Sequence, residues 1–227
     1  MVVRDEAARR RAIRMQRGVL WLSRHWLWLV AGFFGLYVGL AWLAPVLMYI
    51  GATGPARALY TLYSVMCHQF AFRSWFLFGA QAAYPRADAG VAGLGSFESF
   101  AVQDPFFASV PDLYSWTADL QLLSRSFIGN PLMGYKVALC ERDVAIYGAL
   151  FLFALLFALM RNRLRPVPLW LYVLLGLGPI GLDGFSQLLS QPPLSLWAAR
   201  ESTPLFRTVT GALFGLMNGW LALPYLE

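Results

Sequence analysis

The stretch WLWLVAGFFGLYVGLAWLAPVLMYI, residues 26–50, decides the class of fold. No formally charged residue lies between Arg24 and Arg57. A helix of about 20 apolar residues crosses the hydrocarbon core of a bilayer, so this stretch predicts a membrane-spanning helix. The composition agrees: 59% of the 227 residues are hydrophobic and 13% are charged, against about 25% charged in a soluble domain. We therefore expect an integral membrane protein.

Further apolar stretches predict three more spans, at roughly 142–160, 167–189 and 207–226. Residues 57–79 are a different case, because Arg57 and Arg73 leave only 15 uncharged residues between them. As a helix these would reach about 22 Å, which is short of the roughly 30 Å core. We expect an all-α, polytopic membrane helical bundle in a single membrane domain, 1–227, with an interfacial or re-entrant helix at 57–79.

Basic residues indicate the orientation of the bundle. Residues 1–25 hold seven arginines and the RNRLR loop, 161–165, holds three more, of 18 basic residues in all. Such clusters mark cytoplasmic segments, so we expect a multi-pass cell-membrane protein with both termini cytoplasmic and residues 51–141 extracytoplasmic. The net charge of +6 then reflects topology. The expected partner is the lipid bilayer and not nucleic acid, since there is no basic stripe on a soluble module.

This topology gathers polar side chains at the outer face. Asp183 lies 16 residues beyond the start of the third span, about 24 Å along a helix, and Gln187 follows one turn later. Ionisable groups inside a membrane are functional candidates, so Asp183 and Gln187 are the candidate acid/base or cation-binding pair. The alternative is that Asp183 only pairs with Arg142 or Arg207 and locks the bundle.

Four arginines are expected at the same level, and guanidinium groups bind anions well. They predict a site for a negatively charged ligand or a lipid head group, and are Arg73, Arg142, Arg200 and Arg207.

Two cysteines leave three interpretations open. Cys67, His68, Cys140 and Asp143 offer two sulfurs, a nitrogen and an oxygen, which suits a divalent metal such as tetrahedral zinc. A Cys67–Cys140 disulfide is the competing interpretation, because extracytoplasmic cysteines can pair. The third is a nucleophilic Cys67. The spacing of these residues assigns no reaction, so whether the protein is an enzyme stays open.

Four short motifs together resemble one family. They are CHQ-x3-RS-x4-G from Cys67, C-x-R-x4-YG from Cys140, DG-x2-Q from Asp183 and REST-x3-R-x2-TG from Arg200. This set is similar to an uncharacterised prokaryotic membrane-protein family, catalogued as domain of unknown function 2085. The resemblance covers Cys67 to Gly79 and Cys140 to about Gly219. It implies a small helical bundle and no established activity.

The chain departs from this family pattern in two places. The family often has C-x-R-C in its second motif, where this chain has Asp143, and its first two motifs are usually closer together. Here residues 80–135 form a long extracytoplasmic insertion, rich in Gly, Ser, Ala and aromatic residues. We expect no core of its own in this insertion. A second hypothesis is therefore an accessory subunit of a larger membrane complex, with residues 80–135 as the partner contact.

Overall fold

A computed structural model describes residues 2–161 and 163–227. Among them, four helical segments are long and apolar enough to cross a membrane, which confirms the predicted four-span bundle. Three of them are the single helices α1 (Val2–Tyr49), α5 (Glu141–Met160) and α8 (Pro204–Leu226), and the fourth is α6, η4 and α7 in sequence (Leu169–Leu171, Tyr172–Leu177, Gly178–Ser190).

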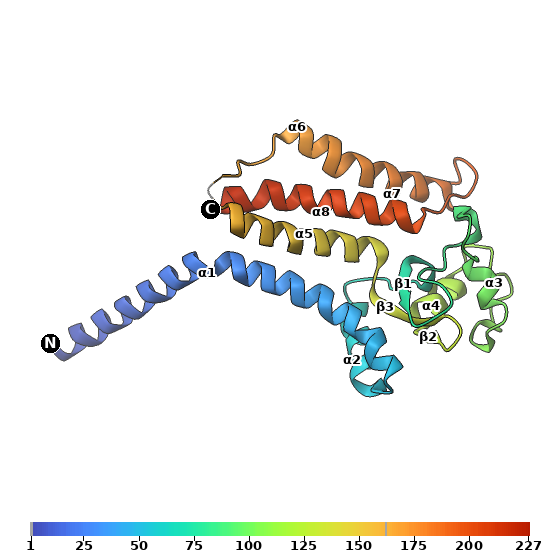
Figure 1. The fold of residues 1–227 in the computed structure, drawn as a ribbon, viewed down its shortest axis with the longest axis horizontal. Helices are drawn as coiled ribbons and strands as arrows, with labels where there is room; N and C mark the ends of the chain where they lie inside the picture. The colour runs from blue at the N-terminus through green and yellow to red at the C-terminus, as the bar shows by residue number, and fades with distance from the viewer. Residues whose placement is uncertain (1, 162) are drawn as a thin grey trace.

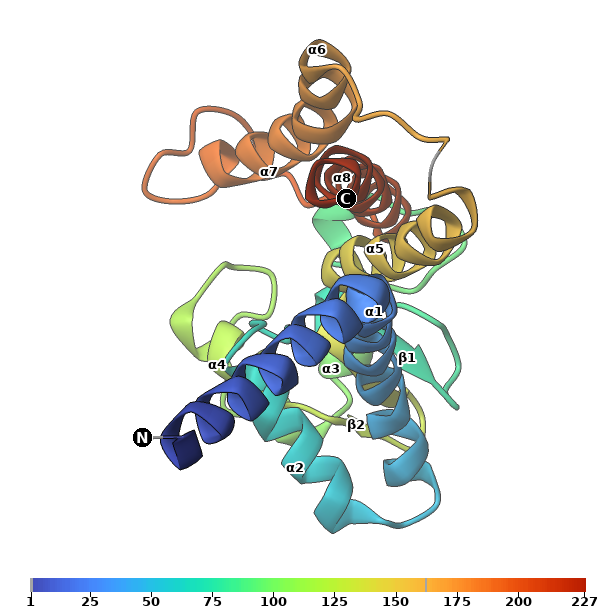
Figure 2. The ribbon, with the colours of Figure 1, turned by 90° about the vertical axis from the view of Figure 1, so that its left-hand side faces the viewer.

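The bundle is a row in which α5 lies between α1 and α8, and α7 packs on the other side of α8 (Figures 1 and 2). Glycines let α8 approach α5 closely. A Cβ atom on Gly215 would lie 2.2 Å from the carbonyl oxygen of Ile146, and one on Gly211 would lie 2.7 Å from that of Arg142. Small residues at a helix interface allow such contact in membranes. The fourth span carries a π-helical turn at Tyr172–Leu177, next to the glycine-rich run before Asp183.

Residues 57–79 differ from the helix that we expected. The helix α2 (Thr53–Ser64) ends early, and a 3-10 turn at Ala71–Arg73 leads into the strand β1 (Ser74–Leu77). Among the described residues β1 pairs antiparallel with β3 (Gly134–Cys140), and β3 pairs with β2 (Gly129–Asn130). The physical reason is that a short apolar run such as SWFL can be a helix or a strand, and only its pairing partner decides.

Residues of the insertion contribute to a buried core that they share with residues 70–76. Its elements after β1 are short and surround the sheet side of the molecule (Figure 1): η2 (Ala87–Ala89), α3 (Phe97–Ala101), η3 (Pro105–Phe107) and α4 (Ala118–Ser126). Phe97, Phe107 and Leu120 pack with Phe72 and Phe76, all at most 2% exposed. Phe97, Phe107 and Phe127 of the insertion are thus buried together with residues 70–76, whereas Phe106 and Tyr114 are exposed.

Candidate functional site

A cavity of about 240 Å³, here called the rim pocket, lies where β3 passes into α5. It opens at the end of the bundle that faces the sheet. Eight of the residues predicted to form a site line it, with Met66, Gln69 and Phe70 beside them; the eight are Cys67, His68, Arg73, Cys140, Arg142, Asp143, Gln187 and Arg207.

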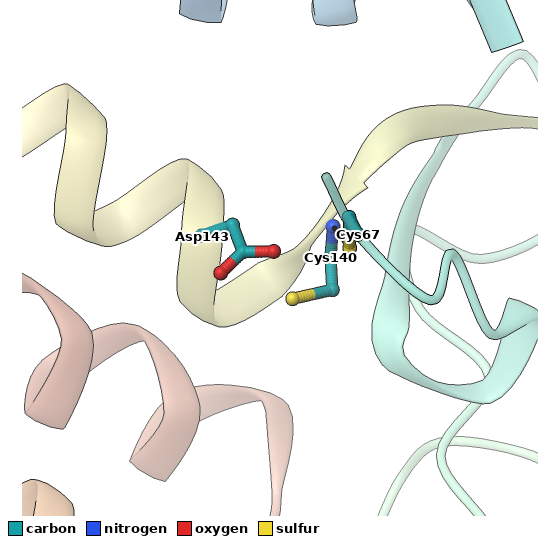
Figure 3. A group of neighbouring side chains, drawn as sticks. All are labelled: Cys67, Cys140 and Asp143. Carbon is teal, nitrogen blue, oxygen red and sulfur yellow. Dashed lines mark hydrogen bonds between the residues drawn. The ribbon is translucent and has the colours of Figure 1, made fainter. Parts of the chain in front are cut away.

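Three of the four predicted metal ligands meet in this pocket. Single ligand atoms of Cys67, Cys140 and Asp143 all lie within 4.8 Å of one another. Figure 3 shows that they come from three places: the loop after α2, the end of β3 and the first turn of α5. Both cysteines of the described chain are free thiols, so no disulfide joins them in this structure.

The fourth predicted ligand, His68, is outside this cluster among the described residues. It lines the rim pocket but is exposed, and its ring stacks on Phe70 at 5.5 Å between centroids. Neighbouring side chains in a chain that is neither helix nor tight turn point in different directions. Cys67 is buried and His68 is exposed, so three of the four predicted ligands form the group in this structure.

Sequence reasoning missed the two residues that hold the Cys67 loop, Gln69 and Lys136. Gln69 has a positive φ of 52°, is buried, and its Nε2 donates to the Tyr60 carbonyl at 2.9 Å. Lys136 is completely buried in β3, and its Nζ donates to the Gln69 carbonyl at 2.6 Å. A lysine inside the apolar run GYKVALC was the signal in the sequence. These bonds fix the position of Cys67 against β3.

The environment of the two sulfurs suits ligand chemistry. The backbone N–H groups of Gln69 and Cys140 both donate to Cys67 Sγ, at 3.4 Å. Such bonds to sulfur are typical second-sphere support for a metal-bound thiolate. The neighbouring Cys67 sulfur, burial and the Asp143 carboxylate raise the pKa of the Cys140 thiol. A bound cation would reverse this effect, because metals bind the deprotonated form.

Ion pairs build one wall of the rim pocket. Both oxygens of Glu201 accept from Arg73, at 2.7 and 2.9 Å, and Arg207 donates to the same carboxylate and to Glu141. Burial raises the pKa of Glu201, but the charges of Arg73 and Arg207 outweigh burial and hold it below its usual value. The network joins the 3-10 turn at Ala71–Arg73, α5 and α8 at the pocket.

Asp183 is buried in a second ion-pair group, behind the pocket. Its carboxylate accepts from Arg142, from Arg200 at 3.1 Å and from Ser202 at 2.8 Å. The described residues that line the pocket include Arg142 and Gln187 but neither Asp183 nor Arg200. Of the two partners predicted for Asp183, the structure thus has Arg142, whereas Arg207 pairs with Glu141 and Glu201.

Some buried polar atoms of residues at the rim pocket have no hydrogen-bond partner. Among the described residues these are Gln187 Nε2, Arg142 Nε and Glu141 Oε1. Gln187 is 7% exposed and lines the pocket, as Arg142 does. An unmade hydrogen bond on a buried group costs about 1–3 kcal/mol. Two such donors therefore belong to residues that line one cavity.

Comparisons with known proteins agree with the motif pattern. No curated protein and no solved structure matches the chain. Residues 120–221 match the model of a family described as "Predicted membrane protein (DUF2085)". The match includes the motifs that begin at Cys140, Asp183 and Arg200 and starts after the motif at Cys67. The resemblance to this family of predicted membrane proteins is thereby confirmed, over residues 120–221 of this chain.

Proposed function

We propose that this membrane protein binds a divalent metal ion in the rim pocket, with zinc as the best fit, through Cys67, Cys140 and Asp143. The observation that carries the proposal is the approach of the three ligand atoms to within 4.8 Å at a cavity wall. Two sulfurs and one carboxylate favour zinc over magnesium or calcium, which prefer oxygen ligands.

The required adjustment is small. In a tetrahedral site with Zn–S bonds of about 2.3 Å, ligand atoms lie about 3.8 Å apart. Side-chain rotation at Cys67, Cys140 and Asp143 would close a gap of this size. Cys140 and Asp143 belong to β3 and α5, and Cys67 lies in the loop after α2. Three protein ligands leave the fourth position open to the cavity, as in sites where a metal meets a second ligand.

The open position faces donors for an anionic ligand. Gln187 and Arg142 line the cavity, and their buried Nε2 and Nε atoms have no partner among the described residues. We propose that a ligand oxygen binds between them and the metal. Arg73 and Arg207 also line the pocket, but their guanidinium groups are held by Glu201. Arg200 and Asp183 would position Arg142, with no reaction assigned to them.

The decisive experiment is metal analysis of the purified protein after incubation with zinc and gel filtration. One zinc per chain is expected for the wild type, and none for Cys67→Ser or Cys140→Ser. The matched control is His68→Ala, which should keep the metal because His68 is outside the ligand cluster.

A thiol count on the denatured, metal-free protein distinguishes the metal site from the competing hypothesis, a disulfide. Two reactive thiols are expected. A count of zero, together with no bound zinc, would establish a Cys67–Cys140 disulfide and overturn the metal proposal.

Two parts of the sequence interpretation stay predictions. Cytoplasmic termini would place the rim pocket on the extracytoplasmic side, and cysteine labelling from either side of the membrane tests this. The accessory-subunit hypothesis predicts that partners co-purify after mild solubilisation and are lost when residues 82–134 are deleted.

A further inference from the structure

A second cavity, here called the apolar groove, lies beside the rim pocket between α1 and the end of α2. Its volume is about 420 Å³. Phe33, Leu36 and Leu40 of α1 line one side, at spacings that place them on one helix face. Leu62, Val65 and Met66 line the other. Met66 lines both cavities, so the groove and the rim pocket adjoin.

We propose that the rim pocket and the apolar groove together bind one anionic membrane lipid, with the head group in the pocket and an acyl chain in the groove. This deepens the proposed function, since it names the ligand class of the same site. The occupant is a membrane lipid and not a soluble anion.

The head-group end is defined by charge and unmade hydrogen bonds. Three arginines line the rim pocket, and each is paired with a carboxylate: Arg73 with Glu201, Arg142 with Asp183, and Arg207 with Glu141 and Glu201. The two donors without a partner, on Gln187 and Arg142, are satisfied by oxygen acceptors. A phosphate group offers several such oxygens, and a metal held by Cys67, Cys140 and Asp143 would take another. A head group without an anionic oxygen satisfies these donors less well.

The groove lies at the right depth for an acyl chain. Tyr147, in the second turn of α5, packs on Tyr37 and Phe34 at 4.8 and 6.0 Å between ring centroids. The groove residues of α1 are thus level with the first turns of the span that begins at Glu141. The pocket lies at the start of that span, and the groove runs from it toward the membrane interior. This is how the head and tail of one lipid are arranged.

Exposed apolar side chains where the apolar groove meets the rim pocket favour a ligand with an acyl chain. Val65 is 84% exposed and Met66 is 68% exposed. Both follow the end of α2 and lie outside the candidate spans. A bound phosphate ion would leave them uncovered, whereas an acyl chain that leaves the pocket past Met66 would cover them. Each buried CH₂ group adds about 0.8 kcal/mol, so the tail should dominate the affinity.

Binding to the detergent-purified, zinc-loaded protein tests this, with three probes: dioctanoyl phosphatidate, dioctanoyl phosphatidylcholine and inorganic phosphate. Phosphatidate is expected to bind at least about tenfold more tightly than either of the others. Equal binding of phosphatidate and phosphate would overturn the tail assignment. Equal binding of the two lipids would overturn the anionic head-group assignment.

Variants assign each end of the lipid. Leu62→Trp fills the groove and should weaken phosphatidate by about tenfold while phosphate binding is unchanged. The matched control is Leu152→Trp, an exposed leucine of α5 that lines neither cavity among the described residues. Gln187→Leu removes an unpartnered donor and should weaken both phosphatidate and phosphate. If Leu62→Trp and Leu152→Trp behave alike, the groove is not the tail site.

The zinc content of the same samples separates the two proposals. Bound zinc without selective phosphatidate binding overturns the lipid inference alone. Selective phosphatidate binding without bound zinc overturns the metal proposal alone and leaves the lipid site standing.

Discussion

Arg73 and Glu201, 128 positions apart in the chain, form a two-bonded ion pair, with Arg73 Nε and Nη2 at 2.7 and 2.9 Å from the two carboxylate oxygens. Glu201 is 1% exposed in its side chain and also accepts from Arg207. One carboxylate therefore ties the 3-10 turn at Ala71–Arg73 to the start of α8 and holds two arginines, Arg73 and Arg207, that line the rim pocket.

Replacement of this carboxylate should destabilise the fold strongly. In Glu201→Gln two guanidinium groups lose their shared counter-charge, and breaking a buried pair costs about 3–5 kcal/mol. The free energy of unfolding in detergent micelles measures the loss. The control is Glu227→Gln, since the Arg161–Glu227 pair is part-exposed and worth about 0–1 kcal/mol. Similar losses in the two variants would contradict the role given to Glu201.

The buried Lys136 predicts a pH dependence. Burial lowers the pKa of Lys136 from 10.5 to about 7. Between these values the unfolded chain binds more protons than the folded chain, so stability rises with pH. Below pH 7 both states are protonated and the penalty for burying the charge is fully present.

Lys136→Met removes the titrating group. The melting temperature of the wild type should therefore increase between pH 7 and 9 more steeply than that of the variant. Equal slopes would show that burial does not shift the pKa of Lys136.

Close packing of α8 on α5 predicts that substitution by alanine costs much more unfolding free energy at Gly215 than at Gly148. A Cβ atom on Gly215 meets the Ile146 carbonyl at 2.2 Å, whereas one on Gly148 meets no described atom within 4 Å. Gly215→Ala should cost about 1–3 kcal/mol of unfolding free energy, as overpacking does. Gly148→Ala is the control and should be neutral or slightly stabilising, because alanine favours helix. Chemical denaturation measures the unfolding free energy of the two variants. An unchanged value for Gly215→Ala would contradict the close packing of α8 on α5.

The roles of Asp183 and Cys140 can be distinguished by zinc content and melting temperature. The Asp183 carboxylate holds Arg142, Arg200 and Ser202 but does not line the rim pocket among the described residues. Asp183→Asn should therefore lower the melting temperature and leave one zinc per chain. Cys140→Ser should do the reverse: lose the zinc with a smaller change in the metal-free melting temperature. Loss of zinc in Asp183→Asn would contradict this and indicate that Asp183 contributes to metal binding.

The number and type of the spans followed from the sequence alone. The length of an uncharged apolar run is a local property, and a bilayer accepts only a backbone that satisfies its own hydrogen bonds, so the run at 26–50 implies a helix without knowledge of its neighbours. The gathering of Cys67, Cys140 and Asp143 was also predicted, because topology places them at one level.

Only the tertiary structure decided what depends on contacts between distant segments. SWFL at 74–77 is a strand because it pairs with β3. Aromatic residues of the insertion are buried because they pack against residues 70–76. His68 lies outside the group formed by Cys67, Cys140 and Asp143, in a loop that hydrogen bonds from Gln69 and Lys136 hold in place. Membrane insertion is fixed by local hydrophobicity, whereas the direction of a side chain is fixed by packing and hydrogen bonds that close over long separations in the chain.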